Sequence, residues 1–438
     1  MPFEVLHRDS NGQYMGAMNL IRTFIGVVCL VAVCSADAQT YRDTFTAVTP
    51  KSFDNGGEVS RQFHLHAESY LRTATIARTG AVTPLGTSDN PDLAALPVAS
   101  RDGEATFAEY VASDPLLDAV IVVHGDGIVF EAYPNMEPWQ RHFGWSVTKV
   151  FTSTAVAALA GRERIDMNAA IETYLPTLAD TAWDGIRVQD IADMASGIDC
   201  LDSDGYQEPT TCIYTMEEAL GVTAPTGRTL NFLDHVKGMQ SHREPGTRYE
   251  YVSANTNVLM LLIEAVTQQP FAEAVRDLLW DPIGAEADAL MVISPEGYAY
   301  GSGGLHARLH DVARFGQIYT QPSASRVLSP TMIERIQASG VPLDPSVDKR
   351  LAERFEAFGD DTPVRAGWQW DMIWADGGIY KGGYSGQGLY VDPGRQLVVA
   401  WFGTGLDYNE QRNDMLSISR QLARSGLFDD AITSRRDH

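Results

Sequence analysis

The sequence predicts a two-lobed α/β (α+β) fold, in which an antiparallel sheet flanked by helices carries a mainly helical insert. Two β-rich stretches, residues 119–133 and 388–403, lie near opposite ends of the chain, and a mainly helical stretch separates them. Strands at both ends with helices between them indicate one sheet built from the two ends of a domain. The cleft between the two lobes is the expected site of chemistry.

The composition is that of a globular protein large enough to bury a sizeable core. The chain has 438 residues, of which 44% are apolar and 21% are charged, and it contains no low-complexity tract or fixed-period repeat. A solenoid or a disordered chain is therefore not expected. At this length one large two-lobed unit or two domains is the expectation.

The individual elements follow from local pattern. Residues 119–133 (AVIVVHGDGIVFEAY) contain two β-rich runs around Gly125-Asp126-Gly127, which predicts a hairpin. Residues 146–160 are apolar on nearly all sides, which predicts a helix buried in the interior. The remaining predicted elements are segments 165–175 and 186–196, helices 257–267 and 271–279, strands 388–392 and 396–403 around a Pro393-Gly394 turn, and a closing helix 415–423.

The amino-terminal residues have the pattern of a secretory signal peptide. Arg22 precedes an apolar run from Phe24 to Cys34, and the small residues 35–38 supply an A-x-A cleavage site. We therefore expect residues 1–38 to be a signal peptide that starts at Met18, and the mature protein to be secreted or periplasmic. Lipidation of Cys34 is the alternative, although the valine before it fits that processing poorly.

The remaining chain divides into a weakly patterned amino-terminal segment and a catalytic domain. Residues 39–115 are expected to be extended with at least one helix, and residues 116–438 to form the domain, with its helical lobe at about 165–310. Of the four cysteines, only Cys200 and Cys212 remain in the mature chain. After export these two are expected to form a disulfide across a short loop.

Charge and missing motifs exclude several classes of function. The formal charge of −24 repels phosphate backbones and anionic lipid, so neither nucleic acid nor a membrane surface is an expected partner. H-E-x-x-H, C-x-x-C, G-x-S-x-G and G-x-G-x-x-G are all absent from the sequence. A metal site, an α/β-hydrolase and a dinucleotide enzyme are therefore not expected. We expect a small-molecule substrate and no cofactor; the sequence does not specify an oligomeric state.

One four-residue motif offers nucleophilic chemistry. Ser146-Val147-Thr148-Lys149 is an S-x-x-K motif, and a three-residue offset on a helix puts both side chains on one face. Burial lowers the pKa of a lysine, so the neutral amine can take the proton of the serine hydroxyl. The start of the helix also offers the Ser146 N–H as a donor to a developing oxyanion.

The motif is not unique in the chain. Ser346-Val347-Asp348-Lys349 also matches S-x-x-K, but it lies in a charged, Pro/Asp-rich stretch that we expect to be a solvated loop or helix start. The chain has only five lysines, and arginine supplies the other 28 basic residues, so a lysine within a motif is informative. Ser146 is the preferred nucleophile and Ser346 the alternative.

Later motifs give the sequence a family resemblance. Tyr251-Val252-Ser253 precedes an apolar helix about a hundred residues after Ser146, and Lys381-Gly382-Gly383 precedes a strand. In this order the motifs resemble those of the class C β-lactamases and their relatives, namely family VIII carboxylesterases, D-aminopeptidases and 6-aminohexanoate-dimer hydrolases. Segments 196–199, 303–305 and 311–316 extend the likeness to roughly residues 115–425. The resemblance implies a β-lactamase/penicillin-binding-protein-like fold.

The resemblance implies roles for three polar residues. Tyr251 would be the phenol near Lys149 that carries the proton of Ser146 to the leaving group. Ser253-Ala254-Asn255 is also an S-x-N triplet, so Ser253 is the alternative for that role. Lys381 corresponds to the family's Lys-Thr-Gly position, with glycine replacing the threonine.

Five further residues are candidates for the walls of the site. The glycines around Gly383 let a substrate lie against the backbone, and the Tyr384 N–H is the candidate second oxyanion donor. Trp145 stands beside the nucleophile and His306 follows a glycine pair. Tyr206 resembles a substrate-contacting tyrosine of the 6-aminohexanoate-dimer hydrolases by its place after residues 196–199.

These features predict a serine hydrolase that cleaves an ester or amide through an acyl-enzyme on Ser146. A carboxylesterase or a 6-aminohexanoate-dimer-hydrolase-like amidase is the leading expectation, because loss of the Lys-Thr-Gly hydroxyl weakens the case for β-lactams. A β-lactamase, D,D-peptidase or D-aminopeptidase is the first alternative. The alternative of another class is an inactive binding protein on the same fold.

Overall fold

The computed structural model describes residues 38–88, 90–320, 325–346, 349–407 and 413–429. The chain divides into two compact units, residues 1–48 and 49–438, and the described part of the first is helical at residues 38–47. The predicted signal segment lies outside the described residues except for Ala38, and it stays a prediction. The predicted division into an amino-terminal segment to residue 115 and a catalytic domain stays a prediction.

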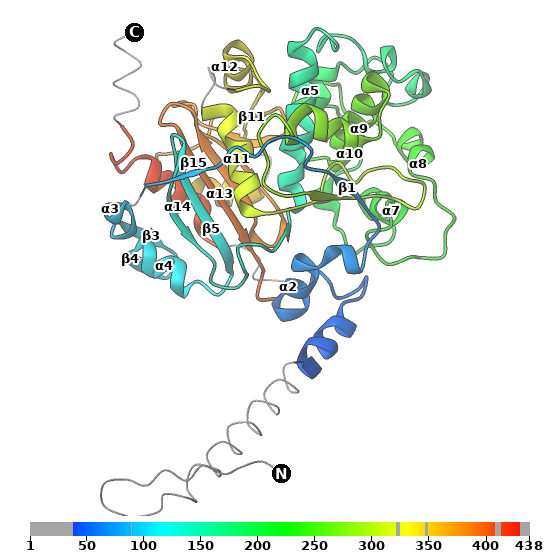
Figure 1. Cartoon of the computed structure of the whole chain (residues 1–438). Coiled ribbons are helices and arrows are strands. Elements are labelled where there is room, and N and C mark those ends of the chain that lie inside the picture. The colour runs from blue at the N-terminus through cyan, green and yellow to red at the C-terminus, as the bar shows by residue number, and fades with distance from the viewer. Residues whose placement is uncertain (1–37, 89, 321–324, 347–348, 408–412, 430–438) are drawn as a thin grey trace, which may run out of the picture. The chain divides into compact units, whose positions relative to one another are not determined.

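A nine-stranded sheet forms one layer of the larger unit (Figure 1). Its pairing is antiparallel except at the β2–β6 edge. The predicted hairpin is present as β5 and β6, and β15 pairs with β5, so the two ends of the domain do meet in one sheet, as predicted. In sheet order the strands are β10 (Val341–Pro342), β11 (Arg365–Gly367), β12 (Trp370–Ile373), β13 (Ile379–Gly382), β14 (Gly388–Asp392), β15 (Leu397–Gly403), β5 (Leu117–His124), β6 (Gly127–Ala132) and β2 (Gly86–Thr87).

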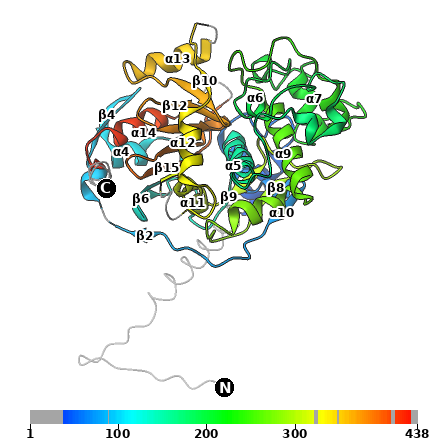
Figure 2. The same ribbon diagram turned by 90° about the horizontal axis from the view of Figure 1, so that it is seen from above.

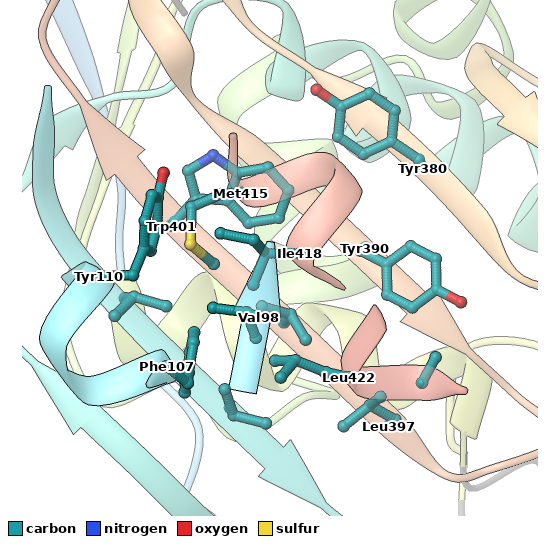
Figure 3. Packing of buried hydrophobic residues seen from close by; sticks show 14 of the residues in the cluster. Val98, Phe107, Tyr110, Tyr380, Tyr390, Leu397, Trp401, Met415, Ile418 and Leu422 are labelled. Carbon is teal, nitrogen blue, oxygen red and sulfur yellow. The ribbon is translucent and has the colours of Figure 1, made fainter. Parts of the chain in front are cut away.

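Side chains alternate across this sheet and give it two buried faces. Leu397 and Trp401 point to the face covered by Ile418 and Leu422 of helix α14 (Met415–Ala423) and by helix α4 (Phe107–Ser113) (Figure 3). Val398, between them in sequence, points the other way and meets helix α11 (Leu309–Thr320). Since both faces are covered by helices, the central strands are mainly apolar rather than alternating, and the buried Asp118 is the exception within β5.

The helical lobe is built around two buried helices that contact each other, α5 and α9 (Figure 2). Segments 165–175 and 186–196 contain only short helical turns, and a four-stranded sheet lies partly within the lobe, so the region is less helical than expected. Among the described residues, no single helix has the length and apolar composition to cross a bilayer. The helices at Ser253–Thr267 and Phe271–Trp280 are long and apolar enough only when taken together, and the pair is bent by 79°. The lobe's helices are α5 (Thr148–Gly161), η3 (Ile171–Thr173), η4 (Pro176–Leu178), α6 (Val188–Ala192), η5 (Asp202–Asp204), α7 (Cys212–Ala219), α8 (Phe232–Gly238), α9 (Ser253–Thr267), α10 (Phe271–Val275) and the π-helical turn η6 (Arg276–Trp280).

The four-stranded sheet joins the amino-terminal residues to the site. Its order is β1 (Thr73–Ile76), β8 (Ala289–Val292), β9 (Leu305–Ala307) and β7 (His142–Phe143). Strand β7 ends two residues before Trp145, so this sheet fixes the start of the turn at Trp145–Val147, which contains Ser146 and is called the nucleophile turn below. The other elements are α2 (Gly57–Leu65), η1 (Ala67–Ser69), α3 (Pro91–Ala94), the hairpin β3 (Pro97–Ser100) and β4 (Gly103–Thr106), η2 (Trp145–Val147), α12 (Pro330–Ala338), α13 (Lys349–Phe358) and η7 (Tyr384–Gly386).

We expect Gly316→Ala to destabilise the protein by about 1–3 kcal/mol, because a Cβ there would lie 2.5 Å from Val398 Cγ1 where α11 crosses the sheet. The matched control is Gly238→Ala in α8, where a Cβ would meet nothing within 4 Å. The control should leave the protein unchanged or stabilise it by up to about 1 kcal/mol. Urea unfolding of both variants measures the difference, and equal stabilities would contradict the close packing of α11 on the sheet.

Candidate active site

The two residues of the S-x-x-K motif meet where strand β7 turns into helix α5. Ser146 lies in the η2 turn, just before the helix, and Lys149 in the first turn of α5. Lys149 Nζ is 3.0 Å from Ser146 Oγ and donates to the Ser302 carbonyl oxygen at 2.8 Å. The Lys149 side chain is almost fully buried, while Ser146 is half-buried and reachable. The pair therefore has the proximity that proton transfer from the hydroxyl requires.

Burial lowers the pKa of Lys149 to about 7, the largest influence being loss of water around the ammonium. The charge of Asp202 opposes this shift and that of Lys381 adds to it. A large fraction of the amine is therefore neutral at neutral and alkaline pH. In that state Nζ can accept the hydroxyl proton of Ser146.

Tyr251 and Lys381 form the opposite wall of the site. Lys381 Nζ donates to the Tyr251 phenol oxygen at 2.9 Å and to Asp371 Oδ1 at 2.5 Å. Both lysine ammonium groups also lie over the Tyr251 ring, with Nζ 5.1 Å (Lys149) and 4.5 Å (Lys381) from its centroid. Ser146 lies near enough to the phenol to lower its pKa. The two motif lysines, the tyrosine and the serine therefore share one site.

The environment of Tyr251 keeps its hydroxyl protonated. Burial, together with the charges of Asp371 and Asp202, raises the pKa of the phenol well above its usual value. A phenol that holds its proton acts as a proton donor rather than as a base. The arrangement thus favours Lys149 as the base and Tyr251 as the acid.

Ser253, the alternative to Tyr251, is engaged elsewhere. Its N–H donates to Asp202 Oδ1 at 2.7 Å and its hydroxyl to Asp202 Oδ2 at 2.5 Å. The Tyr206 hydroxyl donates to the same carboxylate. Ser253 and Tyr206 therefore hold Asp202 in place near Lys149, a role that is not predictable from the sequence pattern of either residue.

The glycine-rich segment after strand β13 packs directly on the nucleophile turn. A Cβ at Gly383 would lie 2.7 Å from the Gly144 carbonyl oxygen, so only glycine permits this approach. The Tyr384 ring packs edge-on against Trp145, with 5.5 Å between the centroids. The Tyr384 hydroxyl donates to the Asp54 carbonyl oxygen at 3.0 Å. Residues 383–384 therefore lie beside Ser146, where an oxyanion donor is needed.

Trp145 has an unusual backbone conformation directly before the nucleophile. Its φ of 44° lies in the left-handed region, which costs a bulky residue about 1–3 kcal/mol. The indole is buried and packs against Phe53, Phe143 and Tyr384. These contacts stabilise a conformation that the residue would not adopt alone.

His306 and Ser346, the serine of the second S-x-x-K motif, have surroundings different from those of Ser146. His306 is buried in strand β9, where its Nδ1 lies 3.2 Å from Glu68 Oε2, and none of its described contacts is with Ser146, Lys149 or Tyr251. The Ser346 hydroxyl donates to Asp344 at 2.6 Å in an exposed loop. The side chain of Lys349 lies outside what the structure describes.

Cys200 and Cys212 are joined by a disulfide. The bridge spans 12 residues and closes the loop that carries Asp202 and Tyr206. The loop that holds the carboxylate near Lys149 is therefore tied at its base.

Three groups in the site are not among the predicted residues: Asp202, Asp371 and the Ser302 carbonyl. Asp371 has a detectable signal, since it is a lone charge within the apolar strand β12 (Trp370–Ile373). Its carboxylate accepts from Lys381 and from the Gly382 N–H, at 3.0 Å. A backbone carbonyl has no signature in the sequence at all.

The chain matches known proteins over most of its length. A family model described as Beta-lactamase matches residues 105–423. The 6-aminohexanoate-dimer hydrolase of Paenarthrobacter ureafaciens is 29% identical over 372 residues, which are 80% of this chain and 88% of the relative.

Solved structures share the fold. A putative 6-aminohexanoate-dimer hydrolase from Bacillus anthracis superimposes with a TM-score of 0.72 at 22% identity, covering 89% of this chain and 98% of that one. A D-stereospecific amidohydrolase from Streptomyces superimposes with a TM-score of 0.52 at 15% identity, covering 72% and 97%.

We expect kcat/KM for p-nitrophenyl acetate to rise with pH through a midpoint near 7, because only the neutral form of Lys149 accepts a proton. Activity is thus present above this pKa and lost below it. Asp202→Asn removes a charge that raises the pKa of Lys149, so the midpoint should move to lower pH. Asp204→Asn, an exposed carboxylate on the same turn, is the control and should leave the midpoint in place. A shift to higher pH in Asp202→Asn would contradict the assignment.

Tyr251→Phe should lower turnover of an amide substrate by about 100-fold or more, because the leaving amine loses its proton donor. Ser253→Ala removes only a hydroxyl that binds Asp202, so its effect should be smaller. Steady-state kinetics of the two variants decide between these residues. A larger loss in Ser253→Ala would transfer the proton-donor role to Ser253.

Proposed function

Since the chain belongs to the β-lactamase family of serine hydrolases, we propose that Ser146 is its nucleophile and that it cleaves esters or linear amides through an acyl-enzyme. The observation that carries the proposal is the contact of Ser146 with a buried lysine of lowered pKa, Lys149, beside a protonated phenol. The base Lys149, the nucleophile Ser146 and the acid Tyr251 lie next to one another, as acyl transfer requires.

Acylation follows from this arrangement. Neutral Lys149 takes the hydroxyl proton of Ser146 while the serine oxygen bonds to the substrate carbonyl carbon, forming a tetrahedral intermediate. The intermediate collapses by breaking the bond to the leaving amine or alkoxide, which takes the phenol proton of Tyr251. The proton gained by Lys149 then restores the phenol, directly or through Lys381, which lies 2.9 Å from the phenol oxygen.

Deacylation uses the same groups with water as the nucleophile. Lys149, neutral again, accepts a proton from the water that attacks the ester carbon of the acyl-enzyme. The Ser146 oxygen takes this proton back from Lys149 as its bond to the acyl carbon breaks, which releases the acid and restores both groups. The backbone N–H groups of Ser146 and Tyr384 are the proposed donors to the oxyanion in both steps. The close packing of Gly383 on Gly144 brings these two segments together.

We propose a linear amide or ester as the substrate in preference to a β-lactam. The relative from Paenarthrobacter ureafaciens is named for a linear amide, the 6-aminohexanoate dimer, and aligns over most of both chains. At the position that resembles the family's Lys-Thr-Gly threonine, Gly382 supplies no hydroxyl, and a Cβ there would lie only 2.4 Å from the Tyr380 hydroxyl oxygen. A side chain at position 382 would therefore have to displace the Tyr380 ring.

Ser146→Ala and Lys149→Ala should each reduce acyl-enzyme formation by several orders of magnitude, roughly 10³-fold or more, because nucleophile and base act as a unit. Ser346→Ala, the matched control from the second S-x-x-K motif, should react like the wild type. Labelling by a fluorophosphonate and the burst of p-nitrophenol from p-nitrophenyl acetate measure this. If Ser346→Ala were the inactive variant, the assignment of the nucleophile would be wrong.

A substrate panel separates the remaining alternatives. It contains p-nitrophenyl esters, the 6-aminohexanoate dimer, nitrocefin and D-alanyl amides. Preferential cleavage of nitrocefin or D-alanyl amides would favour a β-lactamase or D-peptidase. Absence of both labelling and turnover in the wild type would favour an inactive binding protein on this fold.

A further inference from the structure

A buried chain of hydrogen bonds leads away from the residue that precedes the nucleophile. The Trp145 Nε1–H donates to His64 Nε2 at 3.0 Å, and His64 Nδ1 lies 3.1 Å from the Thr404 hydroxyl oxygen. The Thr404 hydroxyl in turn donates to Asp118 Oδ2. All four side chains are at most 7% exposed. Helix α2, the end of strand β15 and strand β5 are thus linked to the nucleophile turn.

This series of hydrogen bonds allows only one consistent arrangement of protons. Indole nitrogen is a donor only, so His64 Nε2 must accept and its proton must lie on Nδ1, which donates to Thr404. The Asp118 carboxylate accepts at the far end, where Arg61 Nε (2.7 Å) and His142 Nε2 (3.1 Å) also point to it. A doubly protonated His64 would present N–H to N–H at Trp145. The chain therefore requires a neutral imidazole.

The surroundings of His64 favour that neutral form. Burial lowers the pKa of His64 well below its usual value, and the neighbouring His142, Arg61 and His306 act in the same direction. The Asp118 charge opposes them without reversing the shift. Burial would raise the pKa of Asp118, but hydrogen bonds and charges from His142 and Arg61 hold it below its usual value, so the acceptor stays ionised.

The indole at the end of this chain belongs to the residue with the left-handed backbone, one position before Ser146. We propose that His64, oriented by Thr404 and Asp118, is a positioning residue that holds Trp145 in this conformation and so places the Ser146 hydroxyl 3.0 Å from Lys149. Ring packing alone resists displacement of the indole, whereas the N–H···N bond also fixes its rotation. The inference rests on the proposed role of Ser146 as nucleophile.

A metal site is the competing interpretation of the same side chains. His64, Asp118 and His142 each bring one possible ligand atom within 4.8 Å of the others. The hydrogen bonds described above already engage both nitrogens of His64 and both oxygens of Asp118. His142 Nε2 faces Asp118, and its Nδ1 lies 3.1 Å from the Phe143 carbonyl oxygen. The geometry is that of a satisfied hydrogen-bond network.

The test compares His64→Leu with His64→Gln in the full-length protein. Glutamine keeps one acceptor and one donor, whereas leucine keeps neither at similar volume. Stopped-flow acylation by p-nitrophenyl acetate, normalised to fluorophosphonate-titrated sites, gives the acylation rate constant and the substrate dissociation constant separately. We expect His64→Leu to lower the rate constant roughly tenfold or more with unchanged dissociation constant, and His64→Gln to recover most of it.

A second pair of variants and one control keep the result interpretable. Thr404→Val should behave like His64→Leu and Thr404→Ser like the wild type, which decides the matter if His64→Leu does not fold. His310→Leu, a half-exposed histidine paired with Glu131 and Glu286, should acylate normally.

Three results would overturn the inference or the function beneath it. Wild-type acylation rates in His64→Leu or Thr404→Val would refute the positioning role. Loss of wild-type acylation on chelation, restored by zinc, would replace the hydrogen-bond network with a metal site. No acylation of the wild-type protein would refute the proposed function itself and leave the contacts of His64 without a catalytic role.

Discussion

The burial of the Lys149 ammonium group sets most of the requirements that the rest of the site meets. An unpaired buried ammonium loses its hydration, and its pKa falls until it can act as a base. The pKa of Lys149 near 7 results from opposing effects: burial and the charge of Lys381 lower it, and the charge of Asp202 raises it. Asp202 is itself buried, and it accepts hydrogen bonds from Ser253 and Tyr206 that make its burial tolerable.

The second motif lysine has a different partner and therefore a different task. Lys381 is fully buried, but its ammonium lies 2.5 Å from Asp371, which stabilises its charged form. It donates to the Tyr251 oxygen, while the raised pKa of the phenol keeps the phenol's own proton in place. Two lysines that look alike in the sequence thus differ in their nearest carboxylate, which is consistent with the proposed roles of Lys149 as base and Lys381 as electrostatic support.

Local pattern was sufficient to predict the elements that depend on local contacts. The hairpin of β5 and β6, the buried helix α5 and the closing helix α14 at Met415–Ala423 all lie where periodicity and turn residues put them. Groups that act through long-range contacts could not be found this way. Asp371 is 10 residues from Lys381, but Thr404 and His64 are 340 residues apart in sequence and meet only in the folded chain, where helix α2 brings His64 to the end of β15. The short turns at 165–196 escaped prediction because tertiary packing determines them.

The residues that fix the geometry of the site are distributed differently from those that carry its chemistry. Ser146, Lys149, Tyr251 and Lys381 all fall within the span matched by the family model, which begins at residue 105. Residues before that point contact the site from outside the span: Phe53 stacks on Trp145 with 5.8 Å between ring centroids, His64 bonds its indole, and the Asp54 carbonyl accepts from Tyr384. Both Trp145 and Tyr384 flank the nucleophile. The amino-terminal residues from 49 onward therefore complete the active site, and a chain that began at the family boundary would keep the reacting groups while losing the contacts that position them.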